Sequence, residues 1–395
     1  MSDPELNKDV ASESLLRILM TTARFLPETG GIETHVHHVA AGLAIRGHRV
    51  TVLTTDRSCA SRSMTEMDGF EVVRVPAFPR NSDYYWAPAI YSEVRDGDWD
   101  LVHVQGCHTF VPILAMAAAI RSSKKFVVTF HSGGHSSWFR NSLRRTQWAL
   151  LSRLFRRADR LIGVSRFEAR SFSRSMRISP QRFTVISNGA EMPKVINPDL
   201  PKGNFIASVG RLEKYKGHQR IIRAMPTLLK RAPDLSLQIV GDGPYKSELQ
   251  RLAEKLKVDH CVKIAGLPPS SRQEMADIFG SAALIVLLSE YEAHPIAVME
   301  ALSCGAKVLV ANTSGLVDLV EDGLVAAVDI DASDANVADH VWEAIQCARA
   351  VDVPKLPTWD NCIDALVASY RSILRPARSE EPPGCRPSDI AEARL

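Results

Sequence analysis

Short apolar runs alternate along the chain with longer stretches in which apolar residues recur at helical spacing. This alternation is typical of parallel β-sheets whose strands are joined by crossover helices. In the first half the predicted strands are residues 15–20, 50–54, 71–75, 101–104, 126–131, 161–164 and 183–187. In the second half they are residues 205–209, 235–240, 262–265, 283–288, 308–311 and 324–328. The pattern predicts an α/β protein with two Rossmann-like domains and a cleft between them.

A break in the pattern separates the two series of strands. Residues 191–203 contain three prolines and little periodicity, as expected of a linker. We expect a first domain over 15–190 and a second over 204–357, followed by a helix over 358–374 that is a candidate to pack back on the first domain. The polar ends of the chain are predicted to be disordered, namely residues 1–14 and 375–395.

The composition fits a soluble protein of 395 residues, with 45% hydrophobic and 24% charged residues. Seven scattered cysteines form no Cys-x-x-Cys pair, which disfavours a disulfide framework or a zinc site. The first residues are polar rather than a signal peptide, and no apolar run approaches the roughly 18 residues of a membrane span. We therefore expect a cytoplasmic protein.

Positive charge is concentrated in one region, although the whole chain carries only +3. Residues 121–190 contain fifteen lysines and arginines but two acidic residues, Asp159 and Glu168. Within this region, residues 140–160 form an amphipathic helical pattern with arginines on one side. Such a pattern fits an ordinary surface helix, but the arginine excess favours an anionic membrane surface, on the inner face of the plasma membrane. Nucleic acid is not expected, because no recognition motif or aromatic platform accompanies the charge.

Two glycine-containing turns follow predicted strands and could bind phosphate. Gly30 and Gly31 precede a helical pattern that closes at Gly47, and such a turn leaves helix N–H groups free for an anion. A tight structural turn explains these glycines equally well. In the second series, Arg211 and Lys216 follow the strand at 205–209, and two fixed cations suit a diphosphate. Solvated surface side chains are the alternative for this pair.

Two carboxylates frame a predicted helix start near the end of the chain. The buried strand at 283–288 leads to Glu292, and Pro295 suits the first position of a helix that contains Glu300. Ligands of open α/β sheets bind at the carboxyl ends of strands, and helix N-termini attract phosphate. This segment is therefore the strongest single indication of a ligand site.

Several histidines have arrangements that resemble functional groups. His131 ends the strand at 126–131, next to glycines, and is either catalytic or structural. The groupings His35/His37/His38 and His131/His135 resemble metal spacings, but no acidic ligand lies beside either of them. We therefore expect the first group on a helix surface and no metal at either group.

Taken together, the order and spacing of these segments resemble glycosyltransferase family 4, whose members are retaining enzymes of the GT-B fold. The resemblance covers roughly Arg17 to Leu374. It is carried by Gly30-Gly31-Ile32-Glu33, Ser187-Asn188-Gly189, Gly210-Arg211-Leu212 with Lys216-Gly217, and Glu292-x7-Glu300. Each motif is weak alone, but four in order are specific.

The resemblance implies roles for matching residues. Arg211 and Lys216 would hold the donor's diphosphate and offset the charge of the leaving group, while Glu300 would accept the ribose hydroxyls. Glu292 would contact the donor sugar, and His131 would reach the sugar near its reacting carbon from the other domain. The remaining donor-binding residues implied are Gly30, Gly31, Leu267, Ala293, His294 and Ile296. No metal or further cofactor is implied, because arginine and lysine serve the phosphates.

The resemblance implies a retaining, hexosyltransferase-type enzyme that uses a UDP- or GDP-sugar and acts on a glycan or lipid-linked acceptor, in cell-surface polysaccharide or glycolipid biosynthesis. Another GT-B enzyme, such as a sugar-nucleotide epimerase, and a non-catalytic nucleotide-sugar-binding protein are the alternatives. One departure from the family pattern bears on the donor. Ala293-His294-Pro295 stands where Gly-Phe-Gly is common, so His294 is expected to affect the choice of sugar.

Overall fold

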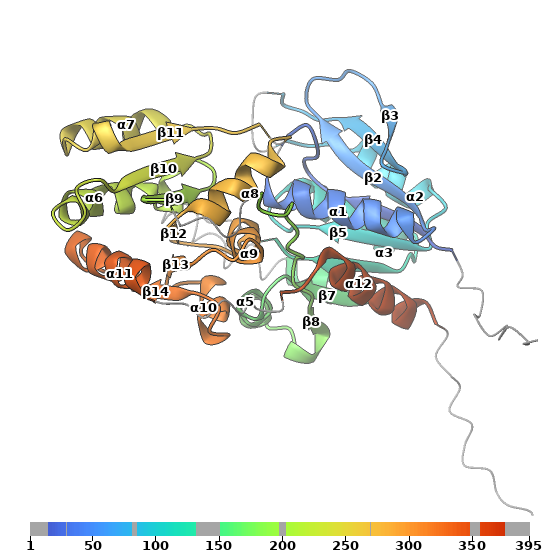
Figure 1. Ribbon diagram of the computed structural model, residues 1–395. Coiled ribbons are helices and arrows are strands. Elements are labelled where there is room, and N and C mark those ends of the chain that lie inside the picture. Colours follow the sequence, from blue (N-terminus) through green and yellow to red (C-terminus); the bar gives the residue numbers. More distant parts are fainter. Residues whose placement is uncertain are drawn as a thin grey trace, which may run out of the picture.

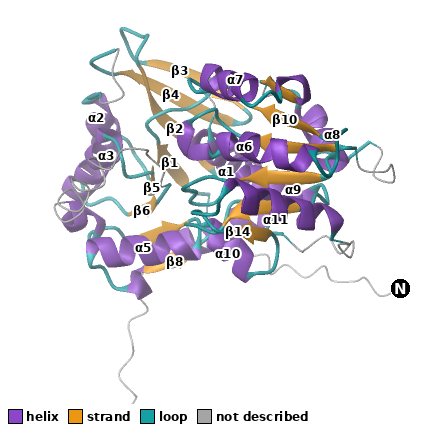
Figure 2. Ribbon diagram, turned by 90° about the vertical axis from the view of Figure 1, so that its left-hand side faces the viewer, coloured by secondary structure: helices purple, strands orange, loops and turns teal. Residues whose placement is uncertain are grey.

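The computed structural model describes residues 15–28, 30–80, 85–131, 151–196, 203–268, 270–347 and 356–375. These residues form two units, each built around its own mostly parallel sheet with helices on both faces (Figure 1). Helices α5 and α10 lie side by side where the units meet, as two perpendicular views agree (Figure 2). The α/β architecture predicted from the alternation of apolar runs is therefore present.

The first unit contains an eight-stranded sheet in the order β3-β4-β2-β1-β5-β6-β7-β8. Its strands are β1 (Arg17–Thr21), β2 (Arg49–Asp56), β3 (Ser63–Met67), β4 (Phe70–Pro76), β5 (Leu101–Gln105), β6 (Phe126–Thr129), β7 (Arg160–Gly163) and β8 (Phe183–Val185). Its helices include α1 (Gly31–Ile45), α2 (Ala89–Asp96), α3 (Phe110–Arg121) and α5 (Arg166–Met176).

The second unit contains a six-stranded, all-parallel sheet in the order β11-β10-β9-β12-β13-β14. Its strands are β9 (Phe205–Val209), β10 (Ser236–Val240), β11 (Val262–Ala265), β12 (Leu284–Leu287), β13 (Val308–Ala311) and β14 (Ala326–Val328). Its helices are α6 (His218–Leu229), α7 (Lys246–Lys255), α8 (Arg272–Ser281), α9 (Ile296–Ser303), α10 (Leu316–Glu321) and α11 (Asp334–Gln346).

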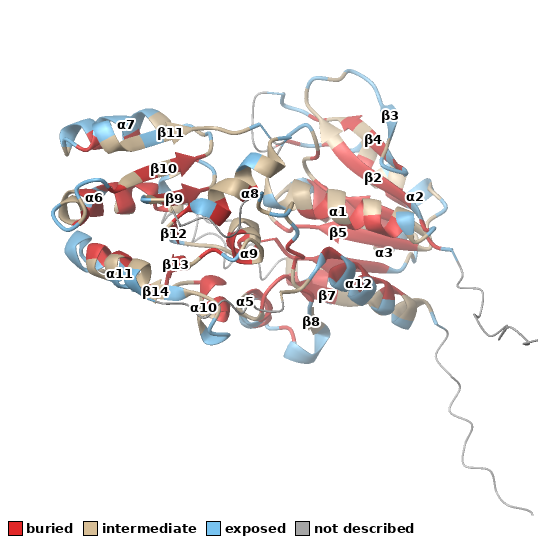
Figure 3. Cartoon of the chain, in the orientation of Figure 1, coloured by how far each residue is buried: buried red, intermediate tan, exposed pale blue. Residues whose placement is uncertain are grey.

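Every strand predicted from the apolar runs is found, with shifts of one or two residues at the ends. The central strands are buried on both faces, which is why they appear in the sequence as continuous apolar runs rather than as alternating patterns (Figure 3). Strand β3 was not predicted. It pairs antiparallel to β4 at the sheet edge, and its residues Ser63 to Glu66 are exposed, so no apolar run marks it.

The last helix, α12 (Trp359–Leu374), belongs structurally to the first unit. It packs against α1 so closely that a side chain at Gly42 would overlap Ile363. Its start is fixed by a capping box between Thr358 and Asn361. The two segments that connect the units meet beside this start. There the amide N–H of Ala190 donates to the carbonyl of Pro357 (3.0 Å).

The basic stretch predicted to meet a membrane lies partly outside the described residues, since 140–150 are not described. Residues 151–155 are helical, and Phe155 is buried in the core of the first unit. Arg153 and Arg157 are exposed, whereas Arg156 donates to the carbonyls of Met176 and Arg177. Across the described segments, no helix combines the length and apolar character that a membrane crossing requires.

Candidate functional site

The two loops that follow β9 and β12 bring a lysine and a glutamate into direct contact. Lys216 ends a short 3-10 helix, Lys214–Lys216, and Glu292 lies in the loop before α9. Lys216 Nζ donates to Glu292 Oε1 at 2.7 Å, and only 17% and 11% of the two side chains are exposed. The sequence placed both residues at one sheet edge but did not predict that they would pair.

The backbone holds these two loops together. The amide of Glu290 donates to the carbonyl of Tyr215 (2.7 Å), and the hydroxyl of Ser289 donates to that of Lys216 (3.3 Å). Gly217 has a φ of +78°, and a side chain there would overlap the carbonyl oxygen of Leu288. Glycine is therefore required for the chain to pass directly from Lys216 into α6.

Lys216 is a fixed positive charge in this environment. Burial by itself lowers the pKa of its ammonium group, but the attraction of Glu292, with Tyr215 and Glu213 nearby, outweighs burial. The pKa of Lys216 is therefore raised above its ordinary value. Lys216 can neutralise an anion here but cannot act as a general base near neutral pH.

The Glu292 loop is anchored from its other side by the start of α10. The amide of Glu292 donates to Ser314 Oγ (2.8 Å), and the amide of Gly315 donates to the carbonyl of Glu292 (2.8 Å). A side chain at Gly315 would overlap the carbonyl oxygen of Ala293. These contacts hold the Glu292 loop so that its carboxylate meets Lys216. They also require the backbone at Ala293 to pack directly against Gly315.

The second carboxylate of the motif lies inside α9, as predicted, but its partner is new. Pro295 is extended and precedes the first helical residue, Ile296, so the helix begins one residue later than expected. Glu300 Oε1 accepts from Arg272 of α8 at 2.7 Å. Burial raises the pKa of Glu300, while Arg272 opposes that rise. Arg272 also donates to the carbonyl of Glu191, where the chain enters the second unit.

Arg211 and the glycine turn approach one another from different units. The Arg211 side chain is 57% exposed and pairs with Glu213 (2.8 Å). Its charge acts on Glu33 of α1, whose pKa is raised mainly by burial. Gly30 is the N-cap of α1 and Gly31 its first residue, and Gly30 offers no side-chain cap. The Glu33 carboxylate lies over Gly30 and accepts from the amide of Glu33 itself, so an acidic side chain already lies at the helix N-terminus on which Arg211 acts.

His131 is held by a buried polar network in the first unit. Its Nε2 lies 2.8 Å from Oε1 of Gln105, and its ring meets that of His35 edge to face at 4.7 Å. Burial, and the nearby charges of His35, His103 and His108, hold the pKa of His131 well below its ordinary value. The imidazole is therefore neutral near neutral pH, and both its geometry and its tautomer are set by partners.

The predicted surface position of the first histidine group is wrong for His35. His35 is 1% exposed, and its Nδ1 lies 2.8 Å from Oδ1 of Asn188. His37 contacts Asp68, and His38 stacks on Trp359 of α12 at 4.4 Å. Helical periodicity alone could not show that α12 covers this side of α1. In the segments that the structure describes, no three His, Cys, Asp or Glu side chains are arranged to hold a metal ion.

His294, where the chain departs from the family pattern, lies within reach of the charge of His35 in the first unit. Burial lowers its pKa to about 4, and the charge of His35 adds to that effect. Its Nδ1 is buried without a hydrogen-bond partner among the described residues. Leu267, the remaining residue of the predicted donor set, follows β11 and packs partly buried on the second unit's core.

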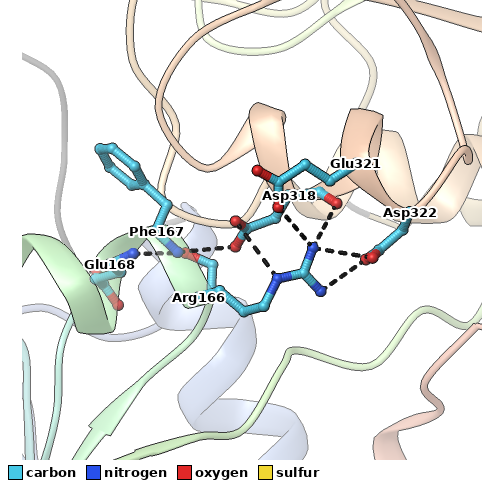
Figure 4. A network of polar contacts seen from close by, with 7 residues as sticks. Arg166, Phe167, Glu168, Asp318, Glu321 and Asp322 are labelled. Carbon is cyan, nitrogen blue, oxygen red and sulfur yellow. Dashed lines mark hydrogen bonds and ion pairs between the residues drawn. The ribbon is translucent and has the colours of Figure 1, made fainter. Parts of the chain in front are cut away.

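A second contact between the units surrounds Arg166, at the start of α5. Its guanidinium donates to Asp322 (2.9 Å to Oδ1) and to the carbonyl of Asp318 (3.0 Å), with Glu321 at 3.4 Å (Figure 4). The amide of Phe167 donates to Asp318 Oδ2 (2.9 Å). Asp318 and Glu321 belong to α10 and Asp322 is its C-cap. Ser314, just before α10, anchors the Glu292 loop, so the contact lies next to the candidate site.

Several contributors were missed in the sequence, namely Arg272, Ser314, Gln105 and Arg166. Each of them acts through a partner that is distant in the chain and carries no local motif. The start of α1, Glu292 and Lys216 each carried a local signal in glycine placement or charge, although the contact between Glu292 and Lys216 did not.

Comparisons with known proteins show to which families the chain is similar. A model of Glycosyltransferase Family 4 matches residues 29–192, and a model of Glycosyl transferases group 1 matches residues 194–350. A glycogen synthase of Mycobacterium tuberculosis is 29% identical over 338 residues, which cover 78% of this chain and 81% of that protein. A GDP-mannose-dependent alpha-(1-6)-phosphatidylinositol monomannoside mannosyltransferase of Mycolicibacterium smegmatis is 28% identical over 352 residues, covering 82% and 88%.

Solved structures share the fold. The structure of Anabaena Alr3699/HepE in complex with UDP and glucose has a TM-score of 0.70 to this chain at 18% identity, and it covers 90% of this chain and 100% of its own. Together with the two parallel sheets, this likeness confirms the predicted GT-B class of fold.

Proposed function

The chain belongs to the glycosyltransferases of family 4, and on that premise we propose that it transfers a hexosyl group from a UDP- or GDP-sugar with retention of configuration. The observation that carries the proposal is the contact between Lys216 and Glu292, at the edge where two strands end and beside Arg211. One cation and one carboxylate held rigidly together suit a ligand that presents a phosphate next to a hydroxyl-rich sugar.

The donor's diphosphate would bind Arg211 and Lys216, with the backbone N–H groups of Gly30 and Gly31 opposite. Lys216 keeps its proton because its pKa is raised, so it can stabilise the negative charge that develops on the departing phosphate. Two fixed cations and a helix N-terminus supply this stabilisation, which supports a reaction that needs no metal and no further cofactor.

The two carboxylates would bind different parts of the donor. Glu300, in α9, would accept the ribose hydroxyls, and Glu292 would accept sugar hydroxyls, with backbone amides from Ala293, His294 and Ile296 nearby. Leu267 would contact the nucleotide. The ring of His131 is neutral, so it would contribute a hydrogen bond and not a positive charge to the sugar near its reacting carbon.

Retention follows if the acceptor hydroxyl attacks from the side of the leaving group. The departing phosphate oxygen then takes the acceptor's proton, while Arg211 and Lys216 hold that phosphate in place. Glu300, the other carboxylate of the motif, is bound to Arg272 and is therefore not proposed as a displacement partner of Glu292.

The donor and acceptor classes draw support from relatives. One relative is named for GDP-mannose and a phosphatidylinositol acceptor, and a solved structure of the same fold holds UDP with glucose. We propose a glycan or lipid-linked acceptor in cell-surface polysaccharide or glycolipid synthesis. Residues 140–160 would meet the anionic inner face of the plasma membrane from the cytoplasm. Sedimentation with vesicles tests this, and equal binding to neutral and anionic lipid would contradict it.

The decisive experiment is a melting-temperature panel with UDP, GDP and ADP, followed by turnover of the matching sugar nucleotides with a lipid extract. A ligand that binds the native state raises the melting temperature. We expect UDP or GDP to do so, and the product to keep the donor's anomeric configuration by NMR. Isomerised donor without acceptor would indicate an epimerase, and binding without turnover would indicate a non-catalytic protein.

A further inference from the structure

A continuous chain of buried polar side chains connects the last helix to His131. The hydroxyl of Tyr370, in α12, lies 2.6 Å from Nδ1 of His103. His103 Nε2 lies 2.7 Å from Thr129 Oγ1 and 3.2 Å from the amide of Gln105. The other end of that amide is 2.8 Å from Nε2 of His131. All five side chains are at most 6% exposed.

The two imidazoles of this hydrogen-bonded series, His103 and His131, each carry one proton near neutral pH. Burial lowers the pKa of His103 to about 3 and that of His131 well below its ordinary range, while burial raises the pKa of Tyr370. The phenol therefore keeps its proton, and both rings are neutral. A neutral imidazole donates from one nitrogen and accepts at the other, so the position of one proton fixes the next.

Tyr370 determines which group donates in each hydrogen bond of this series. A buried hydroxyl that only accepted would leave its own hydrogen unsatisfied, since His103 is its one hydrogen-bond partner among the described residues. The Tyr370 hydroxyl therefore donates to Nδ1 of His103. His103 then carries its proton on Nε2 and donates to Thr129 Oγ1.

The amide of Gln105 transmits this choice to His131. A proton on His103 Nε2 requires the amide oxygen on that side. The structure has Gln105 Nε2 toward His103 and Oε1 toward His131, and half a turn of the amide within the same space exchanges these two atoms. Its nitrogen then donates to Nε2 of His131, which becomes the acceptor. The opposite arrangement would aim two donors, Thr129 and Gln105, at one lone pair of His103 and would leave the phenol hydrogen unsatisfied.

We propose that Tyr370 is a positioning residue that fixes His131 as the Nδ1–H tautomer through His103 and Gln105. Nδ1–H is then the group with which His131 donates a hydrogen bond to the donor sugar. This inference rests on the proposed function for its catalytic consequence, but the tautomer itself can be measured without any substrate.

The test uses the full chain labelled with 15N-histidine and long-range 1H–15N spectra, which distinguish the two tautomers directly. Signals are assigned with the His103→Asn and His131→Asn variants. We expect wild-type His131 as Nδ1–H and wild-type His103 as Nε2–H. In Tyr370→Phe both histidines should lose their single tautomer, and kcat should fall about threefold to tenfold with the donor KM unchanged.

Two further variants keep the test sharp if Tyr370→Phe folds poorly. Gln105→Leu should release His131 while leaving His103 as Nε2–H, because Thr129 still accepts. Leu366→Ala, a packing change at a buried position of the same helix, should lower stability and leave both tautomers unchanged. Finding His131 as Nε2–H in the wild type, or unchanged in folded Tyr370→Phe or in Gln105→Leu, would overturn the proposal. Absence of any glycosyl transfer would overturn the proposed function alone.

Discussion

Lys216 and Glu292, which are 76 positions apart, form one of the least exposed ion pairs of the described residues, with Nζ 2.7 Å from Oε1. The pair joins the loop after β9 to the loop after β12 and so fixes the geometry of the sheet edge. Replacing one partner leaves the other buried charge uncompensated, which lowers the stability of the fold more than replacing both. This difference separates the structural role of the pair from its proposed role in transfer.

Replacing Lys216 with methionine should therefore lower both stability and activity. We expect a loss of about 1 to 3 kcal/mol in the free energy of unfolding, because Glu292 loses its partner in a mostly buried place. Adding Glu292→Gln should recover most of that stability but none of the activity, which should fall at least about a hundredfold. Urea unfolding and donor turnover measure the two effects.

Lys214→Met is the matched control for this pair, since Lys214 is exposed in the same loop. It should change neither quantity appreciably. Turnover near the wild-type level in the double variant would remove Lys216 and Glu292 from the proposed mechanism.

Replacing Glu300 with glutamine should weaken donor binding without slowing chemistry. The carboxylate is proposed to bind the ribose, which is remote from the reacting carbon, so its contribution is equal in the ground and transition states. We expect the donor KM to rise about tenfold, as for loss of a charged hydrogen bond, with kcat within about twofold. Steady-state kinetics test this. Glu274→Gln on the exposed face of α8 is the control, and a large fall in kcat for Glu300→Gln would contradict the assignment.

Replacing Arg166 with glutamine should loosen the contact between the units. The side chain is 38% exposed, so each ion pair contributes at most about 1 kcal/mol. Loss of about 1 kcal/mol would increase the population of more open arrangements about fivefold. Small-angle X-ray scattering should record a larger radius of gyration, and high salt should have the same effect on the wild type. Arg223→Gln, an exposed arginine of α6, should leave the scattering unchanged.

Stability should fall as the pH drops from about 6.5 to about 4. His35 is fully buried and its folded pKa is lowered to about 4 by burial, whereas the unfolded side chain titrates near 6.5. The unfolded state therefore binds more protons in this window, and the stability present above pH 6.5 is lost as the pH falls toward 4. His35 alone should account for about 2 to 3 kcal/mol.

Equilibrium unfolding by urea at a series of pH values measures this dependence. His35→Gln, which keeps a polar group near Asn188, should flatten the curve between pH 6.5 and 4, although His103 and His294 will still contribute. An identical pH slope in the variant and the wild type would show that His35 does not remain neutral in the folded state.

The sequence revealed the strands because buried parallel strands are apolar on both faces, and it missed β3 because that strand is exposed on a sheet edge. Glu292, Glu300 and Lys216 could be found because each follows a recognisable strand and lies near a glycine or a proline. Arg272, Ser314 and Gln105 could not be found, because their roles depend on which strands become neighbours in space. The burial of His35 depends likewise on α12, which lies more than three hundred residues further along the chain.

Trp359, Ile363, Leu366 and Tyr370 complete the same apolar core as Val36 and Leu43 of α1. During translation, the ribosome makes this final helix only after the whole second unit has emerged. Until then, the apolar side of α1 in the nascent first unit stays uncovered, although domains usually fold in the order of their synthesis. Shortening the chain before Trp359 would therefore remove the last helix of the first unit and leave the apolar side of α1 exposed.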